Sequence, residues 1–404
     1  MTEKIYSLYQ MQDMLLADST PDDLRPLMNN GRVPQTPDRT MTAEQVRREI
    51  SLAARTLVNG YCGWPFHEDS MKYQVMKILL NIYTKARDMT AGEFFNKLRP
   101  ALEIIPDGHL SIELNDEKIR SKDKPKYKDV GKNIASRQDT LKLGKHKDIA
   151  VIAISTLNMR SMAKMFGAEQ KFGEDWRKEI EDYKNWNELL EIWEKMFREI
   201  IDGSSALIID LRGNGGGTST PTDRLADYLY GSETQSLLKS YIRATPEGKI
   251  LQKSKGWNVD KKEEKDPAIR NDNTNNPQPA FDPGKGYAKP IYILTDIGVG
   301  SSAEMFIARL YKKHPHVKLV GDNTGGMEVF GDMSKPIVLP HSKIDISVGQ
   351  IYRMMEPYGF EELKGFPPDI RCEEGQDAFD IAIQDFNKNE MNKAAIMMRK
   401  KQNE

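Results

Sequence analysis

Hydrophobic and polar positions follow two different patterns along this chain. Over the first hundred residues, apolar side chains such as Val46, Ile50 and Leu57 recur at helical spacing. The same pattern appears in three runs: 42–57, 71–86 and 90–102. We therefore predict a helical N-terminal domain over residues 1–104.

Beyond residue 105 the apolar positions gather into short runs that are typical of strands. Residues 110–114 alternate apolar and polar side chains, as a half-buried strand does. Almost continuous apolar runs, which suit strands covered on both faces, follow at 148–154, 206–211, 291–295 and 318–321. Helical patterns separate several of these runs, so we predict an α/β core of βαβ type with parallel pairing.

The remaining segments set the expected limits of this second domain, residues 105–390. The run 174–201 predicts one long amphipathic helix whose aromatic face belongs to the core. Residues 253–286 are rich in charge, Asn, Pro and Gly, which predicts a flexible surface insertion. A final helix is expected near 376–387, followed by a polar tail at 391–404.

Composition excludes several classes of protein. The 404 residues carry 59 Lys and Arg against 60 Asp and Glu, a net charge of −1, so nothing favours nucleic acid or an anionic membrane as a partner. Only Cys62 and Cys372 occur, which excludes a disulfide framework and a Cys-rich zinc site and favours two separate thiols.

Targeting signals are not evident in the sequence. The first thirty residues hold no basic segment followed by an apolar run, so no signal peptide is predicted. No run approaches 18 apolar residues, so no membrane span is predicted. The chain as written is expected to be cytoplasmic, with a mature exported form as the alternative.

A glycine-rich segment, Asp210-Leu-Arg-Gly-Asn-Gly-Gly-Gly217, directly follows one predicted buried strand. Glycines at a strand exit let backbone N–H groups face a ligand that approaches closely. A phosphate cradle would be one use, but neither a GxGxxG pattern nor a Walker lysine is present. The other use is an oxyanion hole beside an attacked carbonyl group.

A pair of serines stands at the second informative position, Gly298-Val-Gly-Ser-Ser-Ala-Glu-Met-Phe306. The segment follows a predicted strand and begins a predicted helix, where a serine lies over the positive helix end. Such a serine could be a nucleophile on a tight turn. Alternatively, Ser301 and Glu304 could form an ordinary capping box.

Histidine is scarce, with six in the chain. His109 lies between an Asp-Gly turn and the predicted strand 110–114, where it could serve as a base or simply complete the turn. His146, His314 and His316 lie among lysines and are expected at the surface. The last informative segment, Glu361–Ile370, is a turn-rich loop with carboxylates, which by itself could be a solvated loop.

Together these four segments resemble the tail-specific, or carboxy-terminal-processing, serine peptidases. The resemblance rests on ALIIDLRGNGGG, ILTDIGVGSSAEMF, GDNTGG at 321–326 and the Gly-x-x-Pro-Asp-Ile that ends at residue 370. It points to the branch with the tricorn protease core and the interphotoreceptor retinoid-binding protein modules. It implies a crotonase/ClpP-like α/β core and an endopeptidase that cleaves flexible or C-terminal peptide segments of unfolded proteins, with no metal or organic cofactor.

The resemblance also implies roles for particular residues. It assigns the nucleophile to Ser301, with Ser302 as the rival, and Glu304 closes the Ser-x-x-Glu pattern. The oxyanion donors would be the N–H of Gly215 or Gly216 and that of Ser302. One branch of the family has a lysine base in Thr-x-Gly-Lys, which here ends in Met327; Lys335 is the next lysine.

The other branch uses a histidine and a glutamate, which His109 and Glu362 match. The tricorn-like relay has a serine before the histidine, and here that position is Gly108. A catalytically inactive protein of the same fold that binds peptides or apolar ligands is the alternative function, and an acyl-CoA enzyme is a third. The helical domain and residues 253–286 could cap the site. The oligomeric state stays open.

Overall fold

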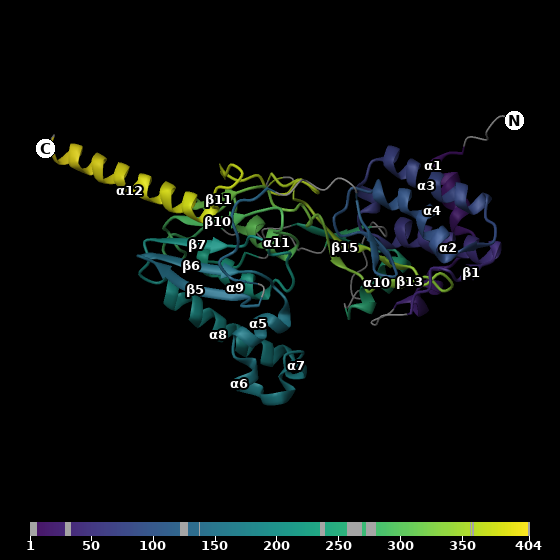
Figure 1. The fold of residues 1–404 in the computed structure, drawn as a ribbon, viewed down its shortest axis with the longest axis horizontal. Helices are drawn as coiled ribbons and strands as arrows, with labels where there is room; N and C mark the ends of the chain where they lie inside the picture. The colour runs from purple at the N-terminus through teal and green to yellow at the C-terminus, as the bar shows by residue number, and fades with distance from the viewer. Residues whose placement is uncertain are drawn as a thin grey trace. The chain divides into compact units, whose positions relative to one another are not determined.

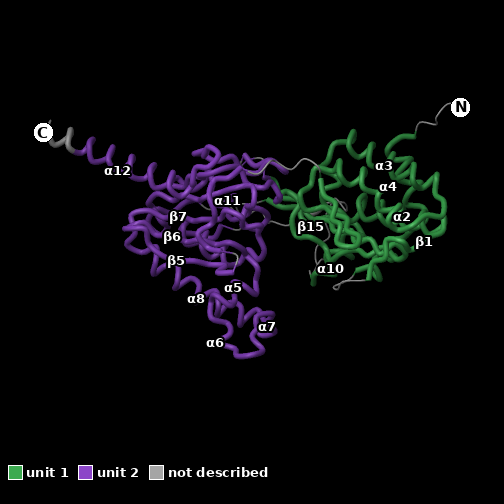
Figure 2. The backbone as a smooth tube through the Cα atoms, in the orientation of Figure 1, with its two compact units in different colours: residues 1–124, 239–275, 329–354 green, residues 125–238, 276–328, 355–404 purple. Residues whose placement is uncertain are grey.

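The computed structural model describes residues 6–28, 34–121, 128–136, 138–234, 239–256, 269–271, 280–355, 357 and 359–402. The chain forms two compact units whose segments alternate along the sequence (Figure 2). Unit 1 comprises residues 1–124, 239–275 and 329–354, and unit 2 comprises 125–238, 276–328 and 355–404. The domain limits at 104 and 390 stay predictions. Much of the predicted insertion, 257–268 and 272–279, lies outside the described residues.

Helices form the N-terminal part of unit 1, as the periodicity predicts. They are α1 (Leu8–Leu16), α2 (Ala43–Arg55), α3 (Asp69–Thr84) and α4 (Ala91–Glu103). Side chains of Thr42 and Thr90 accept the backbone N–H three residues on, which fixes where α2 and α4 begin. The apolar stripe of α2, including Val46 and Ile50, is fully buried.

Antiparallel strands complete unit 1. One sheet has the order β13-β14-β3-β4, from Ile337–Val338, Asp345–Ser347, Ser111–Leu114 and Glu117–Ile119. Another has the order β12-β15-β8-β9, from Phe330–Met333, Gly349–Arg353, Ser240–Arg243 and Ile269–Asn271. A short pair, β1 (Thr40–Met41) and β2 (Met89–Thr90), and helix α10 (Pro246–Ser254) belong to the same unit.

A six-stranded sheet of order β16-β11-β10-β7-β6-β5 forms the centre of unit 2 (Figure 1). Its strands are Ile370–Arg371, Val317–Gly321, Ile291–Thr295, Ala206–Asp210, Ile149–Ile154 and Leu141–His146. All neighbours pair in parallel except β5 with β6. Helices lie between successive parallel strands: those within residues 159–201 before β7, α9 (Thr220–Tyr230) before β10 and α11 (Ser302–Leu310) before β11. The predicted α/β fold with a βαβ core and a helical N-terminal region is confirmed.

Both faces of the central strands are buried, which explains their continuous apolar sequence. On one face, Val151, Ile208 and Leu294 pack with Ala382 and Phe386 of α12 (Ala378–Gln402). Helix α8 (Tyr183–Ile201) packs against β5 and β6, and α9 packs against α8 and α11. Tyr292 Oη donates to Asp385 of α12 at 2.8 Å, which further fixes α12 on the sheet.

Three predictions about helices and histidines are wrong in detail. The run 174–201 contains α7 (Trp176–Glu179) and α8 instead of one helix, because Asp182 caps α8 and breaks the run. Short helices α5 (Met159–Met165) and α6 (Ala168–Phe172) precede them. Helix α12 continues to Gln402, since the predicted tail consists largely of good helix formers. His314 is buried and hydrogen bonds to the Leu229 carbonyl.

The aromatic side chains of this region and the two cysteines agree with the predictions. Trp176, Trp186 and Trp193 are buried. Tyr183 is the exception, 80 % exposed at the start of α8. Cys62 and Cys372 are buried separate thiols, one in each unit.

Candidate active site

Two loops of unit 2 leave neighbouring parallel strands at the same edge of the sheet. The glycine loop, residues 211–217, follows β7, and the serine turn, residues 296–301, follows β10, with Asp210 paired to Leu294. Such an edge, at the carboxyl ends of parallel strands, is where open α/β sheets bind ligands. Asp296 Oδ1 joins the two loops because it accepts the N–H of Gly213 at 2.8 Å and of Gly298 at 2.9 Å.

The glycine loop passes directly against the serine turn. A Cβ atom at Gly216 would lie 2.7 Å from the Gly300 carbonyl oxygen and 2.8 Å from Ser301 Cβ, and Gly216 has φ +93°. The Gly216 N–H donates to Asn214 Oδ1 at 3.0 Å. The Gly215 N–H donates to no partner within the described part of the chain, and a Cβ there would meet nothing within 4 Å. Gly215 therefore keeps a free donor on this loop.

Ser301 occupies a conformation that residues other than glycine rarely adopt, with φ +54° and ψ −129°. Such a backbone costs about 1–3 kcal/mol and is found mostly at functional turns. Ser301 directly precedes α11, but its side chain makes no capping hydrogen bond, so the capping-box alternative is wrong. The strained turn thus leaves the Ser301 hydroxyl free of a structural role at the helix start.

Ser302 differs from Ser301 in the role of its hydroxyl. Its Oγ donates to the Gly217 carbonyl oxygen at 2.6 Å and so ties α11 to the glycine loop. Its backbone N–H belongs to the first turn of α11 and donates to no partner among the described residues. Free N–H groups at a helix start favour negative charge nearby.

Glu362 also belongs to unit 2, in the segment between α11 and α12. Its carboxylate accepts the backbone N–H of Glu328 at 3.3 Å, and the residue is partly buried. The neighbouring Glu361 is exposed and forms an ion pair with Lys364. Met327, at the position where the sequence motif would place a lysine base, contributes its backbone: its carbonyl oxygen accepts the Ser301 N–H at 3.0 Å. Lys335 belongs to unit 1.

His109 belongs to unit 1, immediately before β3. Asp107 Oδ1 accepts the backbone N–H of His109 at 2.7 Å and of Leu110 at 3.0 Å, which fixes the turn. Burial, with help from the charges of Arg353 and Arg120, lowers the pKa of His109 to about 4. Its Nδ1 is buried and has no hydrogen-bond partner among the described residues. The imidazole is therefore neutral near pH 7 and can accept a proton.

Burial also raises the pKa of Asp107. The Tyr61 hydroxyl and the two backbone N–H groups oppose this shift.

No role was predicted from the sequence for two residues of these loops, Asn214 of the glycine loop and Asp296 of the serine turn. Asp296 joins both loops. The backbone carbonyl oxygen of Asn214 accepts the Gly300 N–H at 3.0 Å, and the side-chain amide of Asn214 donates to the Ile154 carbonyl oxygen. The sequence offered two signals: Asn214 stands between two glycines, and Asp296 stands two residues before Gly298. Neither signal indicates which backbone groups these side chains would bind.

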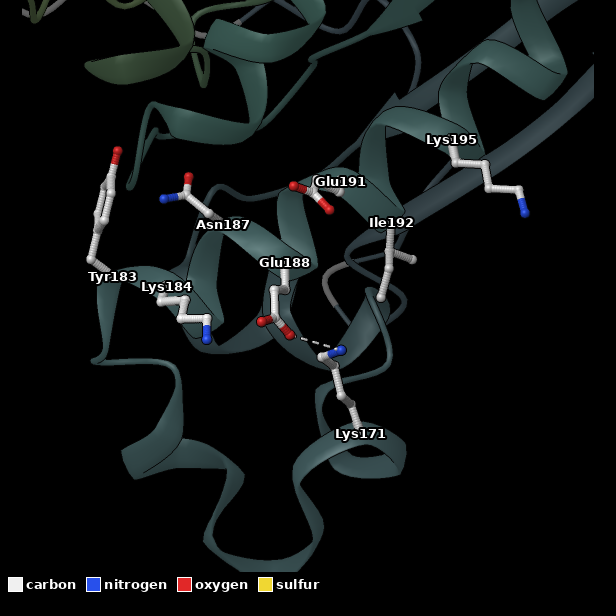
Figure 3. A pocket seen from close by; sticks show the side chains of 8 residues that line it. All are labelled: Lys171, Tyr183, Lys184, Asn187, Glu188, Glu191, Ile192 and Lys195. Atoms are coloured by element: carbon white, nitrogen blue, oxygen red, sulfur yellow. Dashed lines mark ion pairs between the residues drawn. The ribbon is translucent and has the colours of Figure 1, made fainter.

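A separate hollow of about 780 Å³ lies on unit 2 along α8 (Figure 3). Its lining is mostly charged or polar, and Lys171 and Glu188 form an ion pair of 2.9 Å across it. None of its lining residues belongs to the glycine loop or the serine turn.

In the described part of the chain, no group of three or more His, Cys, Asp or Glu side chains is arranged to hold a metal ion.

A strained serine lies between a β-strand and a helix, beside a glycine loop with N–H groups that have no partner in the described structure. This arrangement defines an α/β protein with the geometry of a nucleophile elbow. A family model, peptidase family S41, matches residues 148–372, more than half of the chain. The chain therefore belongs to peptidase family S41 and is a serine peptidase.

Among the solved structures that resemble this chain, one supports the fold with a TM-score above 0.5. A candidate peptidase from Parabacteroides merdae is 16 % identical with a TM-score of 0.51, covering 85 % of this chain and 96 % of that one. A lipoprotein from Streptococcus agalactiae is 15 % identical with a TM-score of 0.40, over 85 % and 95 % of the two chains. The photosystem II D1 C-terminal processing protease is 15 % identical with a TM-score of 0.30, over 56 % and 43 %. Among the described helices, none has the length and apolar character needed to cross a bilayer.

Proposed function

We propose that the protein is an endopeptidase that cleaves flexible or C-terminal segments of peptides and unfolded proteins, with Ser301 as its nucleophile. The single observation that carries the proposal is the strained Ser301 turn, whose side chain makes no capping hydrogen bond to α11. Backbone strain persists where the surrounding structure enforces it, and here Asp296, Asn214 and Met327 hold the turn. A purely structural serine would gain nothing from this conformation.

The proposed oxyanion hole consists of backbone N–H groups on both sides of Ser301. The donors are the N–H of Ser302 and that of Gly215 or Gly216. The Gly215 N–H has no partner among the described residues, whereas the Gly216 N–H would have to leave Asn214 to serve a substrate, which favours Gly215. Removal of one such donor in a serine peptidase typically costs about 10²–10³ in rate.

His109 is the proposed general base and Glu362 the proposed third member. The Ser301 Oγ attacks the scissile carbonyl carbon while its proton passes to the imidazole. The imidazolium then protonates the leaving amine as the C–N bond breaks, and water hydrolyses the resulting ester through the same base. A neutral imidazole supports this role, because an imidazolium could not accept the proton. The Nδ1 of His109, which has no hydrogen-bond partner in the described part of the chain, is the atom at which a carboxylate would stabilise the imidazolium.

The two adjacent serines provide the test, measured as hydrolysis of an unstructured casein-like substrate. Ser301→Ala should lose activity by roughly 10⁶-fold, the loss typical of a missing nucleophile. Ser302→Ala removes only the bond to the Gly217 carbonyl and should retain most activity. An inactive Ser302 variant beside an active Ser301 variant would shift the nucleophile by one residue. Wild-type protein that binds the substrate without cleaving it would favour the ligand-binding alternative.

A further inference from the structure

A buried glutamate on α11 lies beside the proposed nucleophile without facing solvent. Glu304 is 0 % exposed, and its carboxylate accepts three hydrogen bonds from one segment, residues 324–328, which we call the strap. Its Oε1 accepts the Thr324 hydroxyl and the Gly326 N–H, the latter at 2.8 Å. Its Oε2 accepts the Met327 N–H at 2.7 Å. One side chain therefore fixes the path of this whole segment.

The strap in turn holds both residues that the proposed mechanism needs from unit 2. The Met327 carbonyl oxygen accepts the Ser301 N–H at 3.0 Å, and the Glu328 N–H donates to Glu362 Oε2 at 3.3 Å. The Thr324 hydroxyl, which donates to Glu304, also accepts the Phe366 N–H at 2.8 Å, four residues beyond Glu362. The connections run from Glu304 to the strap, and from the strap to the nucleophile and the glutamate.

Steric contacts leave the strap little freedom to adapt. A Cβ atom at Gly325 would lie 2.8 Å from the Ile297 carbonyl oxygen and 2.9 Å from that of Val299. At Gly326, with φ +70°, it would lie 2.5 Å from the Lys364 backbone nitrogen. The strap backbone is therefore tightly packed between the serine turn and residues 363–364. A change at Glu304 would move these groups together.

We propose that Glu304 is a positioning residue, which through the strap sets the Ser301 peptide and the Glu362 carboxylate in register. The inference rests on the proposed function, and Glu304 itself touches no reacting atom. A carboxylate suits the role because it offers acceptors on both oxygens, whereas a glutamine has one acceptor oxygen and would direct N–H donors at other donors. Burial raises the pKa of Glu304 to about 7, although the hydrogen bonds from Thr324, Met327 and Gly326 oppose the shift.

The test compares Glu304 with a matched glutamate in the other unit. Glu49 is also 0 % exposed and accepts the backbone N–H groups of His341 and Ser342. Glu304→Gln and Glu49→Gln should both lower the urea midpoint. Per folded molecule, Glu304→Gln should lower kcat by roughly 10- to 100-fold with KM nearly unchanged, since misplacement by about 1 Å can cost that much. Glu49→Gln should keep the wild-type kcat.

A second pair of variants decides the question if Glu304→Gln does not fold. Thr324→Ser keeps the hydroxyl that links Glu304 to Phe366, and Thr324→Val removes it at similar volume. We expect kcat close to wild type for the serine variant and a fall of roughly tenfold or more for the valine variant. The positioning role would be overturned if Thr324→Ser and Thr324→Val had equal kcat values. It would also be overturned if Glu49→Gln lost as much kcat as Glu304→Gln.

Labelling by a fluorophosphonate separates this proposal from the one on which it rests. If wild-type protein is labelled at Ser301, the proposed function stands, and the variants above then judge Glu304 alone. Glu304→Gln should be labelled more slowly than wild type. If wild-type protein is neither labelled nor active, the proposed function itself fails, and the positioning role falls with it.

Discussion

The two units carry their chemistry in different forms. In unit 2, the serine turn and the glycine loop are defined by backbone geometry: a positive φ at Ser301, glycines in close contact and N–H groups that have no partner among the described residues. In unit 1, the region around His109 is defined by buried titratable side chains, with the pKa of His109 and that of Asp107 both shifted by burial. An acyl-transfer site needs both kinds of feature: fixed donors for a developing charge and a base tuned to accept a proton.

Besides the loss of Ser301 itself, the largest effect should come from removing the proposed base, His109. His109→Ala should lower kcat/KM by roughly 10⁴- to 10⁶-fold, because Ser301 would then lack a group to take its proton. Lys335→Ala is the control, as Lys335 is the nearest lysine after the motif position held by Met327. Hydrolysis of a flexible peptide measures both. Activity that survives in the His109 variant and disappears in the Lys335 variant would mean that the base is a lysine.

The next largest effect should come from Gly216, whose backbone lies directly against the serine turn. Gly216→Ala places a Cβ within 2.7–2.9 Å of Gly300, Ser301 and Ser302, so kcat should fall by roughly 10²-fold as the serine turn shifts. Gly215→Ala meets nothing within 4 Å and keeps its N–H, so activity should stay within roughly twofold of wild type. Steady-state kinetics of the two variants measures the difference. The reverse order would show that the loop does not enclose the serine as described.

A smaller effect is expected at the proposed third member. Glu362→Gln should lower kcat by roughly 10²-fold or less with little change in KM, because a neutral amide cannot stabilise an imidazolium that exists only along the reaction path. Glu361→Gln changes an exposed residue paired with Lys364 and should be nearly silent. Similar losses at both positions would indicate a general effect of negative charge. A silent Glu362 variant would mean that Gly108 leaves the relay broken.

The smallest effect concerns the free energy of unfolding, and it tests whether burial lowers the pKa of a histidine in unit 1. Burial, with the charge of Lys72, lowers the pKa of His67 to about 4 from its ordinary value of 6.5. Between these values the unfolded chain binds a proton that the folded chain does not, so stability is lost as the pH falls. From pH 7.5 to pH 5, wild type should lose about 2 kcal/mol through this residue. Urea unfolding should show a smaller loss in His67→Gln, whereas the exposed control His146→Gln should match wild type.

The central sheet could be predicted from the sequence because its buried strands are almost entirely apolar. Strands such as Ile149–Ile154 and Ala206–Asp210 are covered on both faces, so nearly every position is apolar. The break before α8 could not be predicted, because Trp176 and Trp186 keep one apolar pattern across the Asp182 cap. The sequence also does not show that residues 329–354, which follow segments of unit 2, belong to unit 1. Ile112 and Ile346 pair in one sheet, but nothing in their sequence patterns identifies them as partners.

The candidate site shows the same limit at the level of single residues. The motifs locate Ser301 and Ser302, but only the backbone angles and the bond from Ser302 Oγ to the Gly217 carbonyl distinguish their roles. Glu304 fits a capping box equally well by spacing. Its carboxylate instead binds residues 20 to 23 positions away, a choice made by tertiary packing.

Labelling with a fluorophosphonate, followed by mass spectrometry of the modified peptide, tests the central claim most directly. The probe reports whether a serine is activated and which of the two adjacent serines carries the adduct. We expect the adduct on Ser301 in wild-type protein, almost none in Ser301→Ala or His109→Ala, and retention on Ser301 in Ser302→Ala. An adduct on Ser302, or wild-type proteolysis that proceeds without any serine adduct, would contradict the assignment of Ser301 as the nucleophile.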